Sequence, residues 1–204
     1  MKQTAMVLCL LMSAAFGLAQ ENNSKRITEY YLTPLSFDRL SFSLKYKRQL
    51  KQNKFIKIGL IDLGGYLQNF KPNSSGLFPA NTFQYSAGFQ VGIEKRKTLN
   101  DRFSLFHGPN IGASYRHFQS ELLDPALPVS DRKTISRQQV VSLNYTIGAL
   151  LNVTDRILLA AEVNPGLYYT FTYDKVLINQ SGRNASISGG LSTNFVQLSL
   201  AYRL

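Results

Sequence analysis

The chain has 204 residues and one cysteine, and its formal net charge at pH 7 is +11. This length is enough for one domain, and no internal repeat or shift in composition marks a second one. After residue 19, no apolar run reaches the ~18 residues that a membrane helix needs, which excludes a helical membrane protein. The basic residues gather near two short turns and form no stripe along a groove, so the charge does not predict a nucleic-acid partner.

Residues 1–19 have the three parts of a secretory signal peptide. Lys2 supplies the positive charge, residues 5–16 are mostly apolar, and Gly-Leu-Ala at 17–19 is a small-x-small cleavage site. The apolar run is too short for a membrane anchor. We therefore expect a signal peptide at 1–19 and one domain at 20–204. Because Cys9 lies in the segment removed, the mature chain would have no disulfide, thiolate nucleophile or cysteine-bound metal.

The rest of the chain alternates apolar and polar residues with the period of a β-strand. The pattern predicts eight strands, at 27–35, 39–49, 55–69, 83–94, 102–118, 138–151, 156–173 and 191–204. Asp62 breaks the alternation of the third strand, so we expect a β-bulge near Leu60 and Ile61. An alternative division adds a short strand at 185–190.

The connections between these strands alternate in length. Those at 51–54, 97–101 and 152–155 are tight, whereas those at 71–82, 119–137 and 174–190 are long and rich in Pro, Gly, Ser and Asn. Only the connection at 36–38 departs from this alternation, because it is short where a long one is expected. Transmembrane barrels have short periplasmic turns and long outer loops, so this pattern predicts that both termini are periplasmic.

Alternation alone does not separate a membrane barrel from a soluble barrel, whose apolar face points inward. Three features favour the membrane barrel: polar faces rich in Gly and Ser, strands longer than the ~5–6 residues usual in soluble proteins, and aromatic residues near the strand ends. We expect an outer aromatic girdle of Phe70, Phe83, Tyr85, Tyr115, Phe118, Tyr169, Phe171 and Tyr173, and a periplasmic girdle of Tyr46, Phe55, Phe103 and Tyr202. The predicted fold is an all-β, eight-stranded antiparallel up-and-down transmembrane β-barrel.

The last predicted strand alternates up to the final residue of the sequence. Leu200, Tyr202 and Leu204 lie on its apolar face. Together with the signal peptide and the loop lengths, this strand resembles small outer-membrane β-barrel proteins of the OmpA/OmpX type. The resemblance implies the outer membrane of a Gram-negative bacterium, contact with its lipids, and insertion by the barrel-assembly machinery. That machinery usually reads a terminal Phe, whereas Leu204 ends this chain.

Several charged residues occupy strand positions whose side chains would face the interior of the barrel. They are Glu29, Lys45, Lys57, Glu94, Arg116, Glu162 and Arg203. An eight-stranded barrel leaves little more than side-chain room inside, and charges buried there must pair. We interpret them as a salt-bridged plug, with a narrow polar pore as the alternative.

A search for catalytic chemistry finds one weak pattern. Residues 116–121 (Arg-His-Phe-Gln-Ser-Glu) are faintly similar to the Arg-His-x-Ser stretch of outer-membrane lipid A deacylases. Ser120 stands three positions after His117 instead of two, so the two side chains would face opposite sides of a strand. We therefore expect no catalytic, metal or cofactor site. The sequence predicts a monomeric, non-enzymatic barrel with a structural or surface-interacting role; a pore, a solute or lipid transporter, and a lipid-modifying enzyme are the alternatives.

Overall fold

The structure is a computed structural model that describes residues 26–36, 41–70, 80–123, 128, 132–176, 180–191 and 196–204. The predicted signal peptide lies outside these ranges. Within them, no helix is long and apolar enough to cross a membrane. The strands are β1 (Thr28–Ser36), β2 (Ser41–Lys51), β3 (Lys54–Phe70), β4 (Ala80–Thr98), β5 (Phe103–Leu122), β6 (Lys133–Asn152), β7 (Ile157–Val163), β8 (Pro165–Val176), β9 (Gln180–Leu191) and β10 (Gln197–Arg203).

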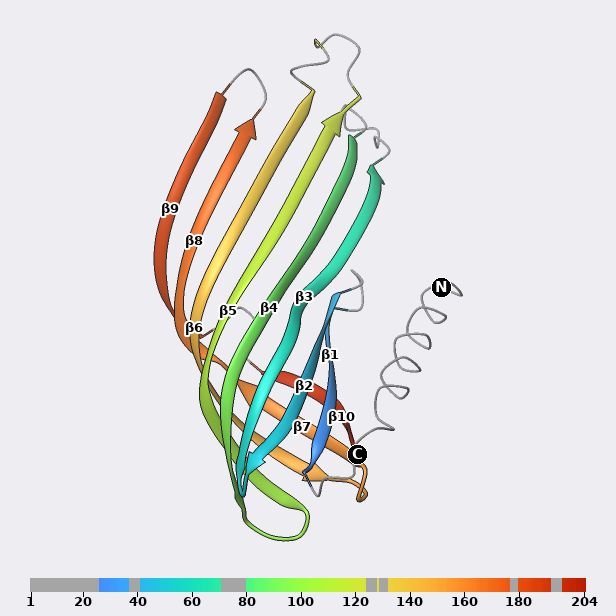
Figure 1. Ribbon diagram of the computed structural model, residues 1–204. Coiled ribbons are helices and arrows are strands. Elements are labelled where there is room, and N and C mark those ends of the chain that lie inside the picture. The colour runs from blue at the N-terminus through green and yellow to red at the C-terminus, as the bar shows by residue number, and fades with distance from the viewer. Residues whose placement is uncertain are drawn as a thin grey trace.

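At one end of the molecule, eight of these strands form a closed antiparallel ring. The order around the ring is β1, β2, β3, β4, β5, β6, β7 and β10, and β10 returns to pair with β1. Each strand pairs with its neighbour along the chain except at this seam and where β10 meets β7 (Figure 1). The predicted barrel is therefore confirmed for this part of the molecule.

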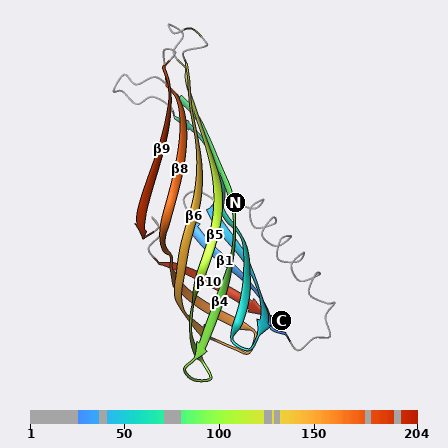
Figure 2. The same cartoon turned by 60° about the vertical axis from the view of Figure 1, so that its left-hand side comes forward.

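Beyond the ring, the longer strands continue as an open curved sheet. The last pair between β2 and β3 joins Ser41 to Gly64, whereas β3 goes on to pair with β4 as far as Phe70. On the other side, β9 pairs with β8 alone among the described residues and forms the end of the sheet order. Figure 2 shows β8 and β9 rising well past the short β1 and β10. Above the ring, β9 and the upper part of β3 are thus the two edges of the sheet, and no pairing joins them among the described residues.

The region from β8 to β10 differs from the sequence prediction. The predicted loop at 174–190 was wrong, because β8 runs to Val176 and β9 begins at Gln180. The less favoured strand at 185–190 is part of β9. The predicted strand at 191–204 is shorter, since β10 begins only at Gln197. Likewise, β5 and β6 extend into the predicted loop at 119–137, to Leu122 and from Lys133.

Two of the irregularities in the strands bear on the sequence prediction. The register between β3 and β4 shifts between Ile61 and Gly64, and Asp62 at this bulge has a φ of 52°. The bulge lies beside the predicted one. The seventh predicted strand is interrupted at Asn164, before Pro165, although β7 and β8 keep the same register against β6. Proline has no N–H for the ladder, which accounts for a break at this point.

The burial pattern is the reverse of that in a soluble protein. Large apolar side chains cover the outside, and Leu60, Phe89 and Leu143 are 51 %, 59 % and 58 % exposed. The inside holds charged residues, and Glu29 and Lys47 are 0 % exposed. The outer surface of the ring therefore suits lipid, as the sequence predicted.

Aromatic residues gather on the outside where the ring ends. The ring of His117 stacks on Tyr85 with centroids 5.1 Å apart, and Tyr85 also contacts Phe83 and Tyr115. At the other end, the ring centroids of Tyr30 and Tyr46 lie 5.4 Å apart. The girdle prediction was wrong for Phe55, which is 3 % exposed and lies in the interior.

Candidate functional site in the barrel lumen

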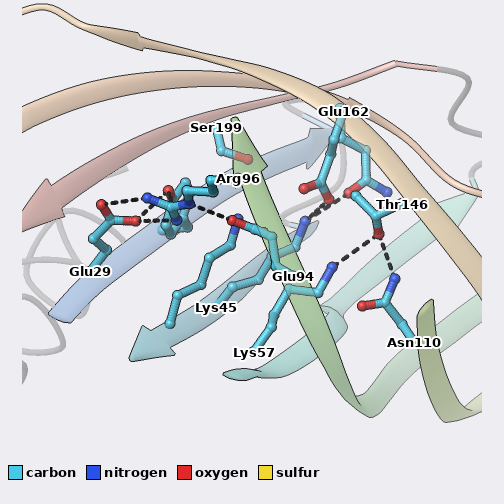
Figure 3. A network of polar contacts seen from close by, with 12 residues as sticks. Glu29, Lys45, Lys57, Glu94, Arg96, Asn110, Thr146, Glu162 and Ser199 are labelled. Carbon is cyan, nitrogen blue, oxygen red and sulfur yellow. Dashed lines mark hydrogen bonds and ion pairs between the residues drawn. The ribbon is translucent and has the colours of Figure 1, made fainter. Parts of the chain in front are cut away.

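The interior of the ring is filled by charged side chains from six strands, and Glu29 of β1 is at one end of this network. Arg96 of β4 donates two hydrogen bonds to the Glu29 carboxylate, from Nη1 to Oε1 at 2.9 Å and from Nη2 to Oε2 at 2.6 Å. Arg203 Nε donates to Oε1 at 3.0 Å, and the Tyr31 hydroxyl donates to Oε2 at 2.7 Å. A fully buried carboxylate is thus satisfied by two guanidinium groups and a phenol, as burial of a charge requires. Figure 3 shows Glu29 and Arg96 joined in this way.

Glu94 of β4 joins two cations in this network. Its Oε2 accepts from Lys47 Nζ at 2.6 Å, and its Oε1 accepts from Arg96 Nε at 2.7 Å. Both cations also lie over aromatic rings: Lys47 Nζ is 4.0 Å from the centre of Tyr31, and the Arg96 guanidinium is 3.7 Å from that of Phe55. The inward Phe55 therefore has a role in the interior that the girdle prediction missed.

The third buried carboxylate, Glu162 of β7, lies at the upper end of the network. It forms an ion pair with Lys45 of β2, whose Nζ also donates to Gln197 Oε1 at 3.1 Å. The Asn164 amide donates to Glu162 Oε1 at 3.5 Å. Gln197 and Asn164 thereby connect the ion pair to a cavity above the ring, which both residues line.

Lys57 of β3 is buried without a carboxylate. It is 1 % exposed, and among the described residues its Nζ has one hydrogen-bond partner, Thr146 Oγ1 at 3.0 Å. Thr146 Oγ1 also accepts from Asn110 Nδ2 and donates to Asn164 Oδ1, each at 2.5 Å. Figure 3 shows Lys57, Thr146 and Asn110 as a chain beside Glu162.

The structure brings together six of the seven charges that the sequence placed inside. Glu29, Lys45, Lys57, Glu94 and Glu162 are buried, and Arg203, with a side chain 22 % exposed, reaches Glu29 from the rim. Arg116 lies apart from them and lines a cavity above the ring.

Sequence reasoning missed Lys47 and Arg96, whose side chains are 0 % and 7 % exposed. Both belong to the basic groups near the two short turns, where a solvated rim explains their charge equally well. The signal was present in the alternation, since Lys47 follows Lys45 by two positions and Arg96 follows Glu94 by two.

A polar cavity of about 360 Å³ lies above the network. Its lining includes Ser43 of β2, Asp62 of β3, Arg116 of β5, Asn164 between β7 and β8, and Gln197 of β10. The side chains that form the network below and those that line this cavity meet at Asn164 and Gln197. The lumen is therefore a hollow whose floor is the ion-pair network.

The other candidate features of the sequence do not meet in one place. His117 stacks on Tyr85 outside, whereas Ser120 Oγ lies 3.4 Å from Thr82 Oγ1. His107 Nδ1 is 2.5 Å from the Tyr145 hydroxyl. In the described ranges, no group of three or more His, Cys, Asp or Glu residues could hold a metal ion.

The predicted assembly signal lies on the seam of the ring. Tyr202 pairs with Tyr30 and Ile157 in register, and Leu200 pairs with Leu32 and Leu159. Leu200 and Leu204 are exposed on the lipid-facing side.

Known proteins resemble this chain in structure and not in sequence. No family model matches the chain, and no curated protein matches it. Among solved structures, a major outer membrane protein from Thermus thermophilus matches with a TM-score of 0.51 at 9 % identity, over 89 % of this chain and 100 % of that one. Ail, the attachment invasion locus protein of Yersinia pestis, matches with a TM-score of 0.42 at 16 % identity, over 88 % of this chain and 97 % of that one. Neisserial surface protein A matches with a TM-score of 0.40 at 14 % identity, over 88 % of this chain and 93 % of that one. The first likeness shows the fold: this chain folds as a small outer-membrane β-barrel, the type that the sequence resemblance predicted.

Proposed function

We propose that the protein is a non-enzymatic, monomeric barrel of a Gram-negative outer membrane that is closed to solutes and binds partners outside the cell. The single observation that carries this proposal is the combination of a charge-filled ring with a sheet that continues past it. The proposed surroundings are outer-membrane lipids, with the barrel-assembly machinery acting during insertion. We propose no nucleic-acid partner.

The length of the strands supports a division into embedded and projecting parts. A tilted strand needs ~9–11 residues to cross the hydrocarbon layer, and β1 has 9 residues whereas β5 and β6 have 20 each. Unpaired backbone groups are not tolerated in lipid, so the open edges of β3 and β9 belong outside the hydrocarbon. The aromatic cluster around Tyr85 and His117 lies where the ring ends, at the level expected of an interface.

The position of the first and last described strands supports an orientation of this barrel in the membrane. Leu204 N donates to Thr28 O at 2.9 Å, and Arg203 N donates to Arg156 O at 2.8 Å. Both ends of the described barrel thus lie with the tight turns, which are periplasmic in outer-membrane barrels. In this orientation the projecting sheet and β9 are extracellular.

The unpaired edge of β9 supports a surface interaction. Residues 181–190 are all exposed, and within the part of the chain that the structure describes the strand pairs on one side alone. A free strand edge presents a row of N–H and C=O groups that an extended peptide can pair with. The proposed mode of binding is therefore β-strand addition to β9.

The proposal is tested with peptides of random sequence selected for binding to the purified protein in nanodiscs. Bound peptides should slow amide hydrogen exchange in β9, and Ile187→Pro should weaken their binding because proline removes an N–H and disturbs the edge. Leu67→Pro, on the opposite edge of the sheet, is the matched control. Binding that is unaffected by Ile187→Pro, or slowed exchange elsewhere than in β9, would contradict this mode.

A further inference from the structure

The ring contains more positive than negative side chains. Among the described residues, the network holds the carboxylates of Glu29, Glu94 and Glu162 against five cations, Lys45, Lys47, Lys57, Arg96 and Arg203. Lys57 is the cation without a carboxylate partner in this set. Five cations against three carboxylates leave a net positive charge, and a buried net charge is costly, so this interior favours the entry of an anion.

The surplus charge lies directly beneath the polar cavity. Lys45 donates to Gln197, which lines the cavity, and Lys57 is joined through Thr146 to Asn164, which also lines it. The two ammonium groups are therefore one and two hydrogen bonds below the cavity floor. The ion pair with Glu162 offsets the charge of Lys45, so the attraction for an anion above this floor comes chiefly from Lys57.

A third cation faces the cavity from its wall. Arg116 lines the cavity, and within the described parts of the chain its guanidinium forms no hydrogen bond or ion pair. Asp62 is the one carboxylate among the described lining residues; it lies beyond ion-pair distance of Arg116, although the two opposite charges attract each other. A guanidinium with available donors matches the oxygens of a phosphate or carboxylate group.

We infer that the cavity above the ion-pair network is an anion site, which takes a phosphate group on Arg116 over the floor formed by Asn164 and Gln197. The group can arrive on a soluble molecule from above or on a lipid from the side where β9 and β3 are not paired. The lipid route has an apolar surface to follow, because a depression of about 530 Å³ lined by Leu44, Tyr30 and Leu200 covers the outside of the ring at β1, β2 and β10. This site is independent of strand addition to β9.

The test uses the protein in a neutral detergent and two probes, inorganic phosphate and a short-chain phosphatidic acid, with binding measured by calorimetry. Arg116→Gln should weaken binding at least about tenfold, since it removes the charge-assisted hydrogen bonds. Arg137→Gln is the matched control, because Arg137 lies on the adjacent strand at the position opposite His117 and is exposed outside the cavity lining. Lys57→Met, which removes the unpaired charge, should weaken binding about threefold or more.

Each outcome has a definite meaning. Binding of inorganic phosphate that depends on Arg116 and not on Arg137 supports the site with a soluble ligand. Binding of the phosphatidic acid alone, with the same dependence, supports the site with a lipid ligand. Failure of both probes to bind, or equal weakening by Arg116→Gln and Arg137→Gln, overturns the inference. If Lys57→Met does not fold, the comparison of the two arginine variants still decides, since neither residue belongs to the ring network.

Discussion

Glu29 and Arg203 are 174 residues apart in the chain, yet they are register partners across the β1–β10 seam and form a hydrogen bond of 3.0 Å. The same carboxylate accepts two hydrogen bonds from Arg96. The seam is therefore joined by a buried ionic network in addition to its backbone ladder.

Replacing Glu29 by Ala should destabilise the barrel by about 3–5 kcal/mol, because it removes a carboxylate partner from the buried Arg96. The matched control is Glu121→Ala, which removes the exposed pair with Lys133 at 3.9 Å and should cost about 1 kcal/mol or less. Urea unfolding in lipid vesicles measures both free energies. Equal losses in the two variants would show that the seam network does not stabilise the barrel.

The network should also close the lumen. Glu29, Glu94 and Glu162 with their cations come from five of the eight ring strands and fill the interior, so we expect no steady conductance from the wild-type protein in planar bilayers. Stable, ion-selective channels would refute the closed lumen and favour the pore. Ser188→Cys, in the cavity above the network, should react with a small water-soluble thiol reagent even though the lumen does not conduct.

The proposed orientation predicts which positions are accessible on intact cells. A cysteine at Ser181 in β9 should react with a reagent that does not cross the membrane, whereas one at Asp155, in a tight turn, should react only after the outer membrane is opened. Both positions are exposed, so a difference in labelling reports the side of the membrane. Labelling of Asp155→Cys alone on intact cells would invert the orientation.

The division into embedded and projecting parts predicts a contrast between two leucines. Leu200 is 50 % exposed on the ring, and Leu200→Arg should cost up to about 2–4 kcal/mol because the charge enters lipid. Leu67 is 79 % exposed beyond the ring, and Leu67→Arg should change the free energy of unfolding by less than about 0.5 kcal/mol. A large loss at Leu67 would place the upper sheet in the membrane.

The alternation of residues was enough to predict the ring, because lipid outside and a polar lumen inside impose opposite demands on successive side chains. The same reasoning failed for β9. Its sequence, QSGRNASISGGL, has few apolar residues and several glycines, so it has no continuous apolar face from which a strand could be predicted. Its pairing with β8 is a tertiary contact, which the alternation of apolar and polar residues along the sequence cannot predict.

The site was harder to predict than the fold. Parity placed Lys45 and Glu94 inside, but the neighbouring turns offered an equally good explanation for the charges of Lys47 and Arg96. Their interior positions depend on how far each strand extends before it turns, and strand ends are the least certain part of a sequence prediction. The cavity depends on the absence of β1 and β2 above the ring, which no local pattern encodes.

The pairing of β1 with β10 also has a consequence for the order of events during biogenesis. The ladder between the earliest and the latest strand is the contact of longest sequence separation in the ring, and such contacts form slowly because the intervening chain must first be ordered. Until that step, β1 retains a bare edge that lipid does not tolerate. A chain arrested before Gln197 would be held as an unfinished, aggregation-prone intermediate, so insertion and closure have to be completed together.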